Sequence, residues 1–307
     1  MRDAFFQALL EHARRDSRIV LVNPDTAGFY CDAFQRELPE QYVNTGIAEQ
    51  NSVGLAAGLA LAGRRPFIFN ILAFNCYRCF EQVRLDVCAM NLGVVLAGVG
   101  AGLDYGLFGP SHHATEDVAL MRTLPGMAVW SPAGANMVAP LVAHCLAAGG
   151  PAYLRLSRAS EPAVYSPETV PTPDDGIAPL RPGRDLLLAA TGSMVARALE
   201  VAAALSGSLD VGVVDVFRLK PFPEQRFVEL AAPYPSIATL EEHIVSGGLG
   251  TAVLEAISGH GMYKNVRRLG LPCTFCRICG DREYLQRQCG LDTASLVARI
   301  LESSPAR

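Results

Sequence analysis

The sequence has no run of the roughly 18 consecutive apolar residues that a membrane-spanning helix requires. Its first segment also lacks the unbroken apolar core of a signal peptide. Apolar side chains recur there instead at the spacing of an amphipathic helix, at Phe5, Phe6, Leu9, Leu10 and Ala13. Lys and Arg form no cluster that would follow a nucleic acid, and the net charge is −4. We therefore expect a cytoplasmic protein, and 307 residues with 50% apolar content suffice for two domains with sizeable cores.

No disulfide framework is evident from the cysteines. Six of the nine are scattered along the chain, which is typical of reduced core residues: Cys31, Cys76, Cys79, Cys88, Cys145 and Cys289. The other three form Cys273-x-x-Cys276-x-x-Cys279, a spacing that can hold an iron–sulfur cluster or, less typically, zinc. The run lacks the fourth Cys followed by Pro of ferredoxin-type motifs, so we favour a surface loop and assign no metal ligand.

A dinucleotide-binding fingerprint is also missing. The stretch Gly247-Gly248-Leu249-Gly250 follows a strand-like run and opens a helix, but it contains only part of that fingerprint. We interpret it as a tight strand-to-helix turn and reject nucleotide binding there.

What the chain does have is a regular alternation of apolar, strand-like runs with helical patterns. The runs are residues 19–23, 67–72, 94–99, 128–131, 153–156, 186–190, 211–216, 237–240 and 266–269. Such alternation predicts parallel sheets covered by helices on both faces. Between residues 159 and 184, six prolines exclude a helix interior or a central strand. We predict an α/β fold with two doubly wound parallel-sheet domains, 1–160 and 185–307, joined by a Pro-rich linker at 161–184.

One carboxylate, that of Glu49, stands at the start of a helix of small residues. The stretch Asn44-Thr45-Gly46-Ile47-Ala48-Glu49-Gln50-Asn51 leads into Gly54, Ala56, Ala57, Gly58, Ala60 and Ala62. Little side-chain bulk separates this helix from whatever lies against it, so we expect Glu49 to be partly dry. A carboxyl group in such a place has a raised proton affinity unless a cation pairs with it, and groups of this kind cluster at functional sites.

The ordered succession of motifs after Glu49 resembles a known family. The motifs are Ala73-Phe74-Asn75-Cys76-Tyr77, Gly106-Leu107-Phe108-Gly109-Pro110-Ser111-His112-His113, Leu154-Arg155-Leu156-Ser157-Arg158, Thr191-Gly192-Ser193, Leu219-Lys220-Pro221-Phe222 and Glu241-Glu242-His243. Their order is similar to that in the pyrimidine-binding and C-terminal domains of thiamine-diphosphate-dependent transketolases. The resemblance covers essentially the whole chain. It implies a pyrimidine-binding fold followed by a transketolase C-terminal-like domain.

The resemblance implies a set of residues around the cofactor. Glu49 would contact the pyrimidine ring nitrogen and activate the cofactor by donating a proton there. Phe74 and Tyr77 would flank the ring, and a helix beginning near Phe74 would place both on one face. Asp25, after the first strand, and Ile71, at the end of the second, are further cofactor-side positions.

Substrate positions follow from the same resemblance. His112 would bond substrate oxygens and move protons, and Arg158 matches an arginine that binds the substrate phosphate. Three positions depart from the family: Phe108 stands in place of an acid, Gly100 in place of a histidine and Phe29 in place of a serine. These exchanges remove hydrogen bonds to a polar sugar phosphate. We therefore expect a specialised ketol donor or acceptor rather than a pentose-phosphate role.

The Gly-Asp-Gly motif that binds the divalent cation in this superfamily is absent. The resemblance therefore implies that a separate N-terminal, diphosphate-binding subunit holds Mg²⁺ and the diphosphate of thiamine diphosphate. We expect an α2β2 heterotetramer with the active site between the two kinds of chain.

Two alternative interpretations stay open. The β subunits of 2-oxo acid dehydrogenases share Met1-Arg2-Asp3-Ala4 and an Ile-Ala-Glu motif, which would mean acyl transfer to a carrier or lipoyl arm. Glu49-Gln50-Asn51 and Glu241-Glu242-His243 favour ketol transfer instead. The third interpretation is a non-catalytic partner subunit, against which the retention of Glu49, Phe74 and His112 argues.

Overall fold

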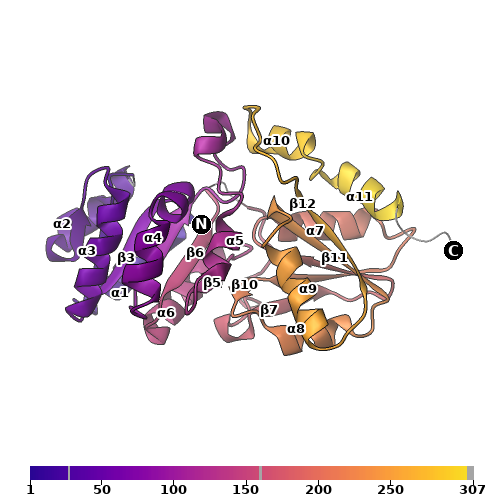
Figure 1. Cartoon of the computed structure of the whole chain (residues 1–307), viewed down its shortest axis with the longest axis horizontal. Coiled ribbons are helices and arrows are strands. Elements are labelled where there is room, and N and C mark those ends of the chain that lie inside the picture. Colours follow the sequence, from indigo (N-terminus) through magenta and orange to yellow (C-terminus); the bar gives the residue numbers. More distant parts are fainter. Residues whose placement is uncertain (27, 159–160, 303–307) are drawn as a thin grey trace.

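The computed structural model describes residues 1–26, 28–158 and 161–302, which form two α/β domains side by side (Figure 1). Each domain is built on one sheet with helices on both faces. The predicted fold class is confirmed, and each sheet carries in addition one antiparallel strand at an edge.

The first domain contains a seven-stranded sheet. Its strands are β1 (Ile19–Asn23), β2 (Tyr42–Asn44), β3 (Arg65–Ile71), β4 (Val95–Val99), β5 (Ala128–Trp130), β6 (Ala152–Leu156) and β10 (Arg218–Lys220), in the order β10-β5-β6-β4-β3-β1-β2. The helices are α1 (Arg2–Ala13), α2 (Asp32–Glu37), α3 (Glu49–Leu61), α4 (Phe80–Gln82), α5 (Asp117–Thr123) and α6 (Val138–Ala148), with π-helical turns at Phe74–Arg78 and Val83–Cys88.

The second domain contains a five-stranded sheet. Its strands are β7 (Ile177–Arg181), β8 (Leu186–Ala190), β9 (Val211–Val216), β11 (Ser236–Ile244) and β12 (Asn265–Leu271), in the order β12-β11-β8-β9-β7. Its helices are α7 (Met194–Ala204), α8 (Glu224–Ala231), α9 (Leu249–Gly259), α10 (Arg282–Gln288) and α11 (Thr293–Glu302).

The central strands are buried on both faces because alternate residues enter two different hydrophobic clusters. In β3, Phe67 and Phe69 pack in the cluster that contains Phe5 of α1, and the Phe5 and Phe69 rings stack at 5.2 Å. Ile68 between them packs in the cluster that contains Val53 of α3. Burial on both faces requires continuous apolar strands, which is the pattern seen in the sequence.

All nine predicted strands overlap observed ones, and the strands that were not predicted, β2, β7 and β10, lie at sheet edges. The predicted linker is in part a strand, because β7 pairs antiparallel with β9. In addition, β10 follows β9 along the chain but completes the first sheet by pairing with β5. The domain limits stay a prediction, and residues 159 and 160 lie outside the described residues.

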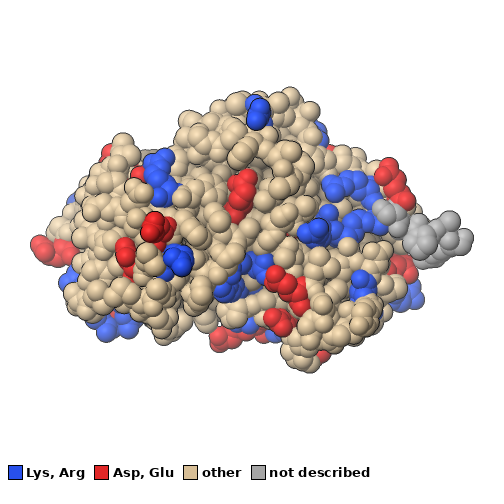
Figure 2. Space-filling view, in the orientation of Figure 1, with Lys and Arg blue, Asp and Glu red and all other residues tan. Residues whose placement is uncertain are grey.

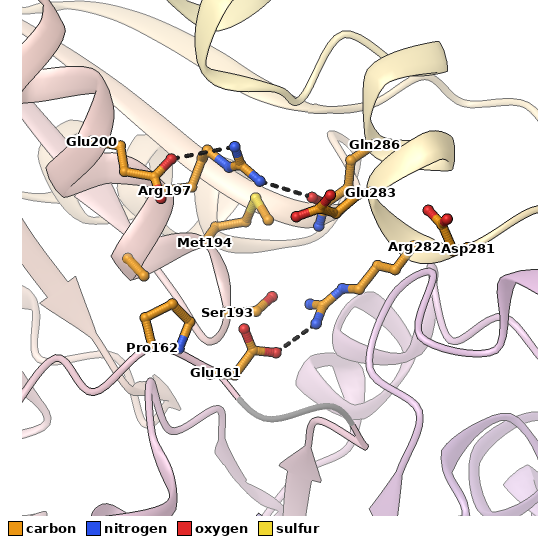
Figure 3. Close-up of a pocket in the computed structure, with 11 residues that line it drawn as sticks. Glu161, Pro162, Ser193, Met194, Arg197, Glu200, Asp281, Arg282, Glu283 and Gln286 are labelled. Atoms are coloured by element: carbon orange, nitrogen blue, oxygen red, sulfur yellow. Dashed lines mark hydrogen bonds and ion pairs between the residues drawn. The ribbon is translucent and has the colours of Figure 1, made fainter.

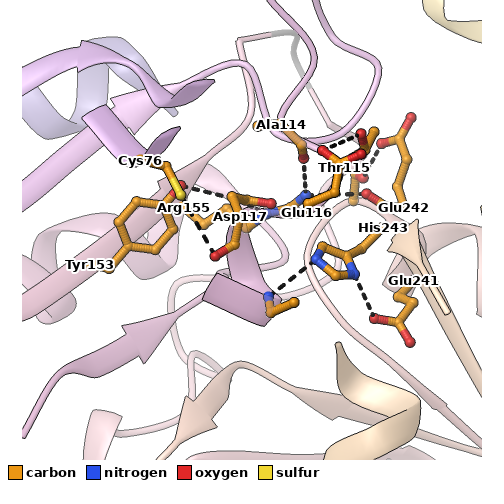
Figure 4. A network of polar contacts seen from close by, with 12 residues as sticks. Cys76, Ala114, Thr115, Glu116, Asp117, Tyr153, Arg155, Glu241, Glu242 and His243 are labelled. Carbon is orange, nitrogen blue, oxygen red and sulfur yellow. Dashed lines mark hydrogen bonds and ion pairs between the residues drawn. The ribbon is translucent and has the colours of Figure 1, made fainter. Parts of the chain in front are cut away.

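A buried polar network joins the two domains (Figure 4). Arg155 lies 3% exposed in β6, and its Nε atom is 2.8 Å from Oδ2 of the fully buried Asp117. Its Nη2 donates to the carbonyl of Ala114 in the first domain (3.0 Å) and to that of Glu242 in the second (3.1 Å). Tyr153 also donates to Asp117, at 2.9 Å. One guanidinium group therefore bonds both domains.

Charged side chains lie in small groups of both signs on the face drawn in Figure 2. The largest blue group lies on part of the C-terminal domain, and most of the surface in this view carries neither charge. Among the described residues, none of the helices is both long enough and apolar enough to span a membrane.

Candidate functional site

Glu49 is the first residue of α3 and is buried, with 4% exposure. Its Oε1 atom accepts a hydrogen bond of 2.7 Å from Nη1 of Arg78. The Arg78 guanidinium also lies 4.4 Å from the centre of the Phe74 ring. Sequence reasoning missed Arg78, which lies at the end of a π-helical turn that the sequence did not predict. A cation that pairs with Glu49 is thus within this chain.

The opposite side of α3 is open. Gly54, Leu55, Gly58 and Leu61 are exposed, and a Cβ atom added at either glycine would contact nothing within 4 Å. The sequence suggested that another surface packs closely on this small-residue helix. Among the described residues, none lies against these two glycines.

Phe74 and Tyr77 both lie in the π-helical turn after β3 but contact different groups. The Phe74 ring contacts the Arg78 guanidinium and also the His112 ring, whose centre lies 5.0 Å from its own in an edge-to-face arrangement. The Tyr77 hydroxyl instead donates to Oε2 of Glu116 (2.8 Å) and accepts from the Glu116 backbone N–H (3.0 Å). Burial raises the pKa of Tyr77. The two side chains therefore make different contacts, and their placement around the cofactor ring stays a prediction.

His112 lies at the centre of an aromatic cluster. Its ring is 4.9 Å from Phe108, 5.8 Å from Tyr105 and 5.0 Å from Phe74. Its Nδ1 is 2.9 Å from the Ser111 hydroxyl, which leaves Nε2 for a ligand. Burial and, to a smaller extent, the Arg78 charge lower the pKa of His112 below its usual value, so the neutral imidazole prevails near pH 7. A neutral imidazole can accept a proton from a substrate hydroxyl.

Arg158 is the last in a series of contacting side chains that starts at Glu49, the contact chain of this site. Its backbone N–H donates to Oδ2 of Asp104 at 2.6 Å, and its guanidinium lies 5.1 Å from the centre of the Tyr105 ring. The side chain is exposed. Contacts therefore run without a break from Glu49 through Arg78, Phe74 and His112 to Tyr105 and Arg158.

The Tyr105 ring explains why position 100, a histidine in the family, carries no side chain here. The φ angle of Gly100 is +101°, and a Cβ atom on it would overlap two carbons of the Tyr105 ring. Sequence reasoning missed Tyr105, which lies outside the matched motif. The only signal in the sequence was an aromatic residue five positions after the lost histidine.

The other predicted residues lie outside this contact chain. Asp25 is exposed after β1, with φ +61°, and its Oδ1 accepts from Asn44 at 3.0 Å. Ile71 is half-buried at the end of β3. Phe29 is 72% exposed and stacks on Tyr30 at 4.2 Å, while the Arg2 guanidinium covers the Tyr30 ring.

The residues near Glu49 fit the pyrimidine ring of thiamine diphosphate. A buried carboxylate suits a basic ring nitrogen, and Phe74 provides an aromatic surface for a planar heterocycle. The Nδ2 group of the fully buried Asn70, one residue before Ile71, has no hydrogen-bond partner among the described residues. Unpartnered buried donors are uncommon, so Asn70 is a further polar group at the end of β3 that a ligand atom would satisfy if it reached it.

The glycine stretch of the second domain is not a phosphate site. The Glu241 carboxylate accepts from the backbone N–H groups of Leu249 (2.7 Å) and Gly250 (2.8 Å), so an acid already caps the start of α9. A Cβ atom on Gly248 would overlap that carboxylate. The interpretation as a tight turn agrees with this geometry.

The cysteine run lies in the loop between β12 and α10. Cys273 and Cys279 are exposed, and Cys276 and Cys289 are half-buried free thiols. Within the described part of the chain, no group of three or more His, Cys, Asp or Glu side chains is arranged to hold a metal ion.

A separate hollow of about 460 Å³ lies between Glu161, the start of α7 and α10 (Figure 3). Both arginine side chains that line this hollow are already paired with glutamates. Arg282 is 2.5 Å from a Glu161 oxygen and Arg197 is 3.3 Å from Glu200. We therefore keep it outside the candidate site.

Comparisons with known proteins agree with this architecture. The family profile "Transketolase, pyrimidine binding domain" matches residues 1–162, and "Transketolase, C-terminal domain" matches residues 176–296. The chain is 35% identical to the 6-deoxy-6-sulfo-D-fructose transketolase subunit SqwH of Clostridium sp. (strain MSTE9), over 97% of this chain and 92% of that protein. It is 34% identical to a subunit of the apulose-4-phosphate transketolase of Phocaeicola vulgatus, over 98% and 96% respectively.

A solved structure described as a split gene transketolase, inactive beta4 tetramer, is 36% identical and superposes with a TM-score of 0.87, over 98% of this chain and 97% of that chain. The predictions of family and fold are thereby confirmed. The chain belongs to the transketolase family, as a transketolase-type subunit made of the pyrimidine-binding and C-terminal domains.

Proposed function

We propose that this chain is one component of a two-component, thiamine-diphosphate-dependent transketolase. It would transfer a two-carbon ketol unit from a ketose or hydroxypyruvate-like donor to an acceptor aldehyde. The unbroken contact chain from Glu49 to Arg158 supports this proposal, because it connects a buried acid, an aromatic side chain, a neutral histidine and an exposed cation.

Each residue has a defined task in this proposal. When bound, thiamine diphosphate supplies nucleophilic attack on the donor carbonyl and carries the two-carbon fragment. Glu49 holds the proton at the pyrimidine ring nitrogen, and Phe74 packs on the ring. His112 takes and returns a proton at Nε2, from a substrate hydroxyl. Arg158 binds an anionic group at the far end of the substrate.

A partner subunit would hold Mg²⁺ and the diphosphate, in an α2β2 assembly that we expect in the cytoplasm. The open face of α3 and the exposed Phe29 and Phe108 support a covering chain. The similar split transketolase of known structure is described as inactive when it is a tetramer of β chains, which also supports the need for a partner.

The substrate would be specialised and anionic. The two relatives are named for a sulfonated ketose and for a ketose phosphate, both of which carry a charged end. Phe108 in place of an acid removes a hydroxyl ligand near His112, so fewer hydroxyl groups of the substrate would be recognised there.

The first prediction concerns Glu49→Gln in the complex assembled with partner, thiamine diphosphate and Mg²⁺. We expect a loss of turnover of at least about 100-fold, because an amide cannot hold the activating proton. Glu81→Gln is the matched control, since Glu81 is an exposed glutamate of nearby α4. Steady-state rates measure both variants.

Turnover of Glu49→Gln within about twofold of wild type would contradict catalysis and favour a non-catalytic partner role. Tight binding of thiamine diphosphate and Mg²⁺ by the isolated chain would contradict the two-component assignment. Calorimetric titration of the single chain tests the second point.

A further inference from the structure

Tyr105 occupies space that the backbone at Gly100 leaves vacant. With φ at +101° and no Cβ atom, Gly100 allows the Tyr105 ring to approach its backbone directly. Any side chain at position 100 would meet this ring. The phenol therefore stands where a residue at position 100 would otherwise form part of the wall of the site.

The segment on either side of Tyr105 is fixed by both domains. Oδ1 of Asp104 is 3.0 Å from Arg282 of α10, and Oδ2 accepts from the Arg158 N–H. Gly106 packs so closely on the loop before α10 that a Cβ atom would overlap the Gly280 carbonyl. With its two chain neighbours held, the ring is preorganised, as a residue that selects substrates must be.

The Tyr105 hydroxyl is free to bind a ligand. Among the described residues it has no hydrogen-bond partner, and the ring is half-buried. Burial raises the pKa of Tyr105 above its usual value, and the opposing effects of the Arg158 and Arg2 charges are smaller. The phenol therefore stays protonated at neutral pH and acts as a donor, beside the Arg158 guanidinium 5.1 Å from the ring centre.

We propose that Tyr105 is a specificity-determining residue, which takes the place of a side chain at position 100 and donates a hydrogen bond to the tetrahedral oxyanion at the distal end of the substrate. A phosphate ester and a sulfonate share this chemistry. Tyr105 and Arg158 bind this anion together, and Phe108 and His112 line the path toward the reacting carbon. This inference rests on the proposed ketol transfer.

The kinetic test compares acceptors with and without the anion in the assembled complex, with hydroxypyruvate as donor. For D-glyceraldehyde 3-phosphate, Tyr105→Phe raises KM by about 10-fold, the effect of one hydrogen bond to a charged group, and leaves kcat within about twofold. For D-glyceraldehyde, neither constant changes. Tyr263→Phe, at a tyrosine that is 97% exposed in the second domain, leaves all values unchanged. Equal effects of Tyr105→Phe on both acceptors would overturn the inference.

A binding measurement separates this inference from the proposed function. Inorganic phosphate and methanesulfonate are titrated calorimetrically into the complex, with no turnover required. Weaker binding of either anion by both Tyr105→Phe and Arg158→Gln supports the inference and identifies which oxyanion the site prefers. Anion binding unchanged in Tyr105→Phe overturns it. Failure of the wild-type complex to consume hydroxypyruvate would refute only the proposed ketol transfer. The anion titrations would still decide whether Tyr105 binds an oxyanion.

Discussion

Neighbouring groups limit which residue each position of this site can carry, and Gly100 is the clearest case. Gly100→Ala should lower the free energy of unfolding by about 2 kcal/mol or more, since it adds strain at φ +101° and overlap with Tyr105. Adding Tyr105→Ala to that variant should recover the part due to overlap. Gly207→Ala, at a position with open space and no positive φ, is the control. Urea unfolding measures all four proteins.

A Gly100→Ala loss within about 0.5 kcal/mol of the control, or no recovery on adding Tyr105→Ala, would show that the ring can move away. The rigid placement of Tyr105 would then be wrong.

At the same scale, the sequence is sufficient to find most of the contact chain. Motifs single out Glu49, Phe74, His112 and Arg158, and the structure joins them. Arg78 is missed because the turn that carries it is π-helical, a backbone form that residue patterns do not indicate. The same turn directs Tyr77 toward Glu116 rather than to the Phe74 ring.

Among the elements, the edge strands are the least predictable from sequence. Central strands have continuous apolar runs, whereas β2 and β10 have three residues each and are defined by their pairing with β1 and β5. β7 lies in a segment rich in proline, a composition that suits an edge strand as well as a linker. Local pattern cannot show which sheet a short strand will join.

The segment leading to β7 is tied to β9 through a buried acid. Tyr165 donates to Oδ2 of Asp215 at 2.8 Å, and burial raises the pKa of Asp215 to about 8. Because the folded pKa lies above the unfolded value of 3.8, this group stabilises the fold at low pH. Its contribution falls, by about 1.4 kcal/mol per pH unit, as pH rises toward the folded pKa.

Asp215→Asn should therefore be more stable than wild type by a margin that grows between pH 5 and pH 8. The amide keeps a neutral acceptor for Tyr165 and never ionises. Asp174→Asn, at a side chain that is 88% exposed in the same segment, should follow the wild-type profile. Denaturant unfolding at several pH values measures these stabilities. A difference between Asp215→Asn and wild type that shrinks with rising pH would contradict the raised pKa of Asp215.

At the scale of the whole molecule, Arg155 links the two domains at their buried joint. Arg155→Met should lower the free energy of unfolding by about 3–5 kcal/mol, because it leaves the Asp117 carboxylate buried without its cation. It also removes bonds to carbonyls of both domains, so the thermal transition should broaden or split. Calorimetry measures both effects.

Arg184→Met is the comparison for this variant, since Arg184 is 87% exposed in its pair with Asp210 and its loss should change little. A single sharp transition with a wild-type midpoint in Arg155→Met would show that the two domains are held together by other contacts.

The whole chain provides half of the site that we propose. Glu49, His112 and Arg158 belong to the contact chain, and one face of α3 is exposed and could pack against a partner. The central claim is that the assembled enzyme transfers a ketol unit rather than an acyl unit. The most direct test is single-turnover consumption of hydroxypyruvate and of pyruvate by the chain reconstituted with its partner, thiamine diphosphate and Mg²⁺. The account predicts that hydroxypyruvate is consumed faster. Faster consumption of pyruvate would contradict it and would assign the chain to decarboxylating acyl transfer.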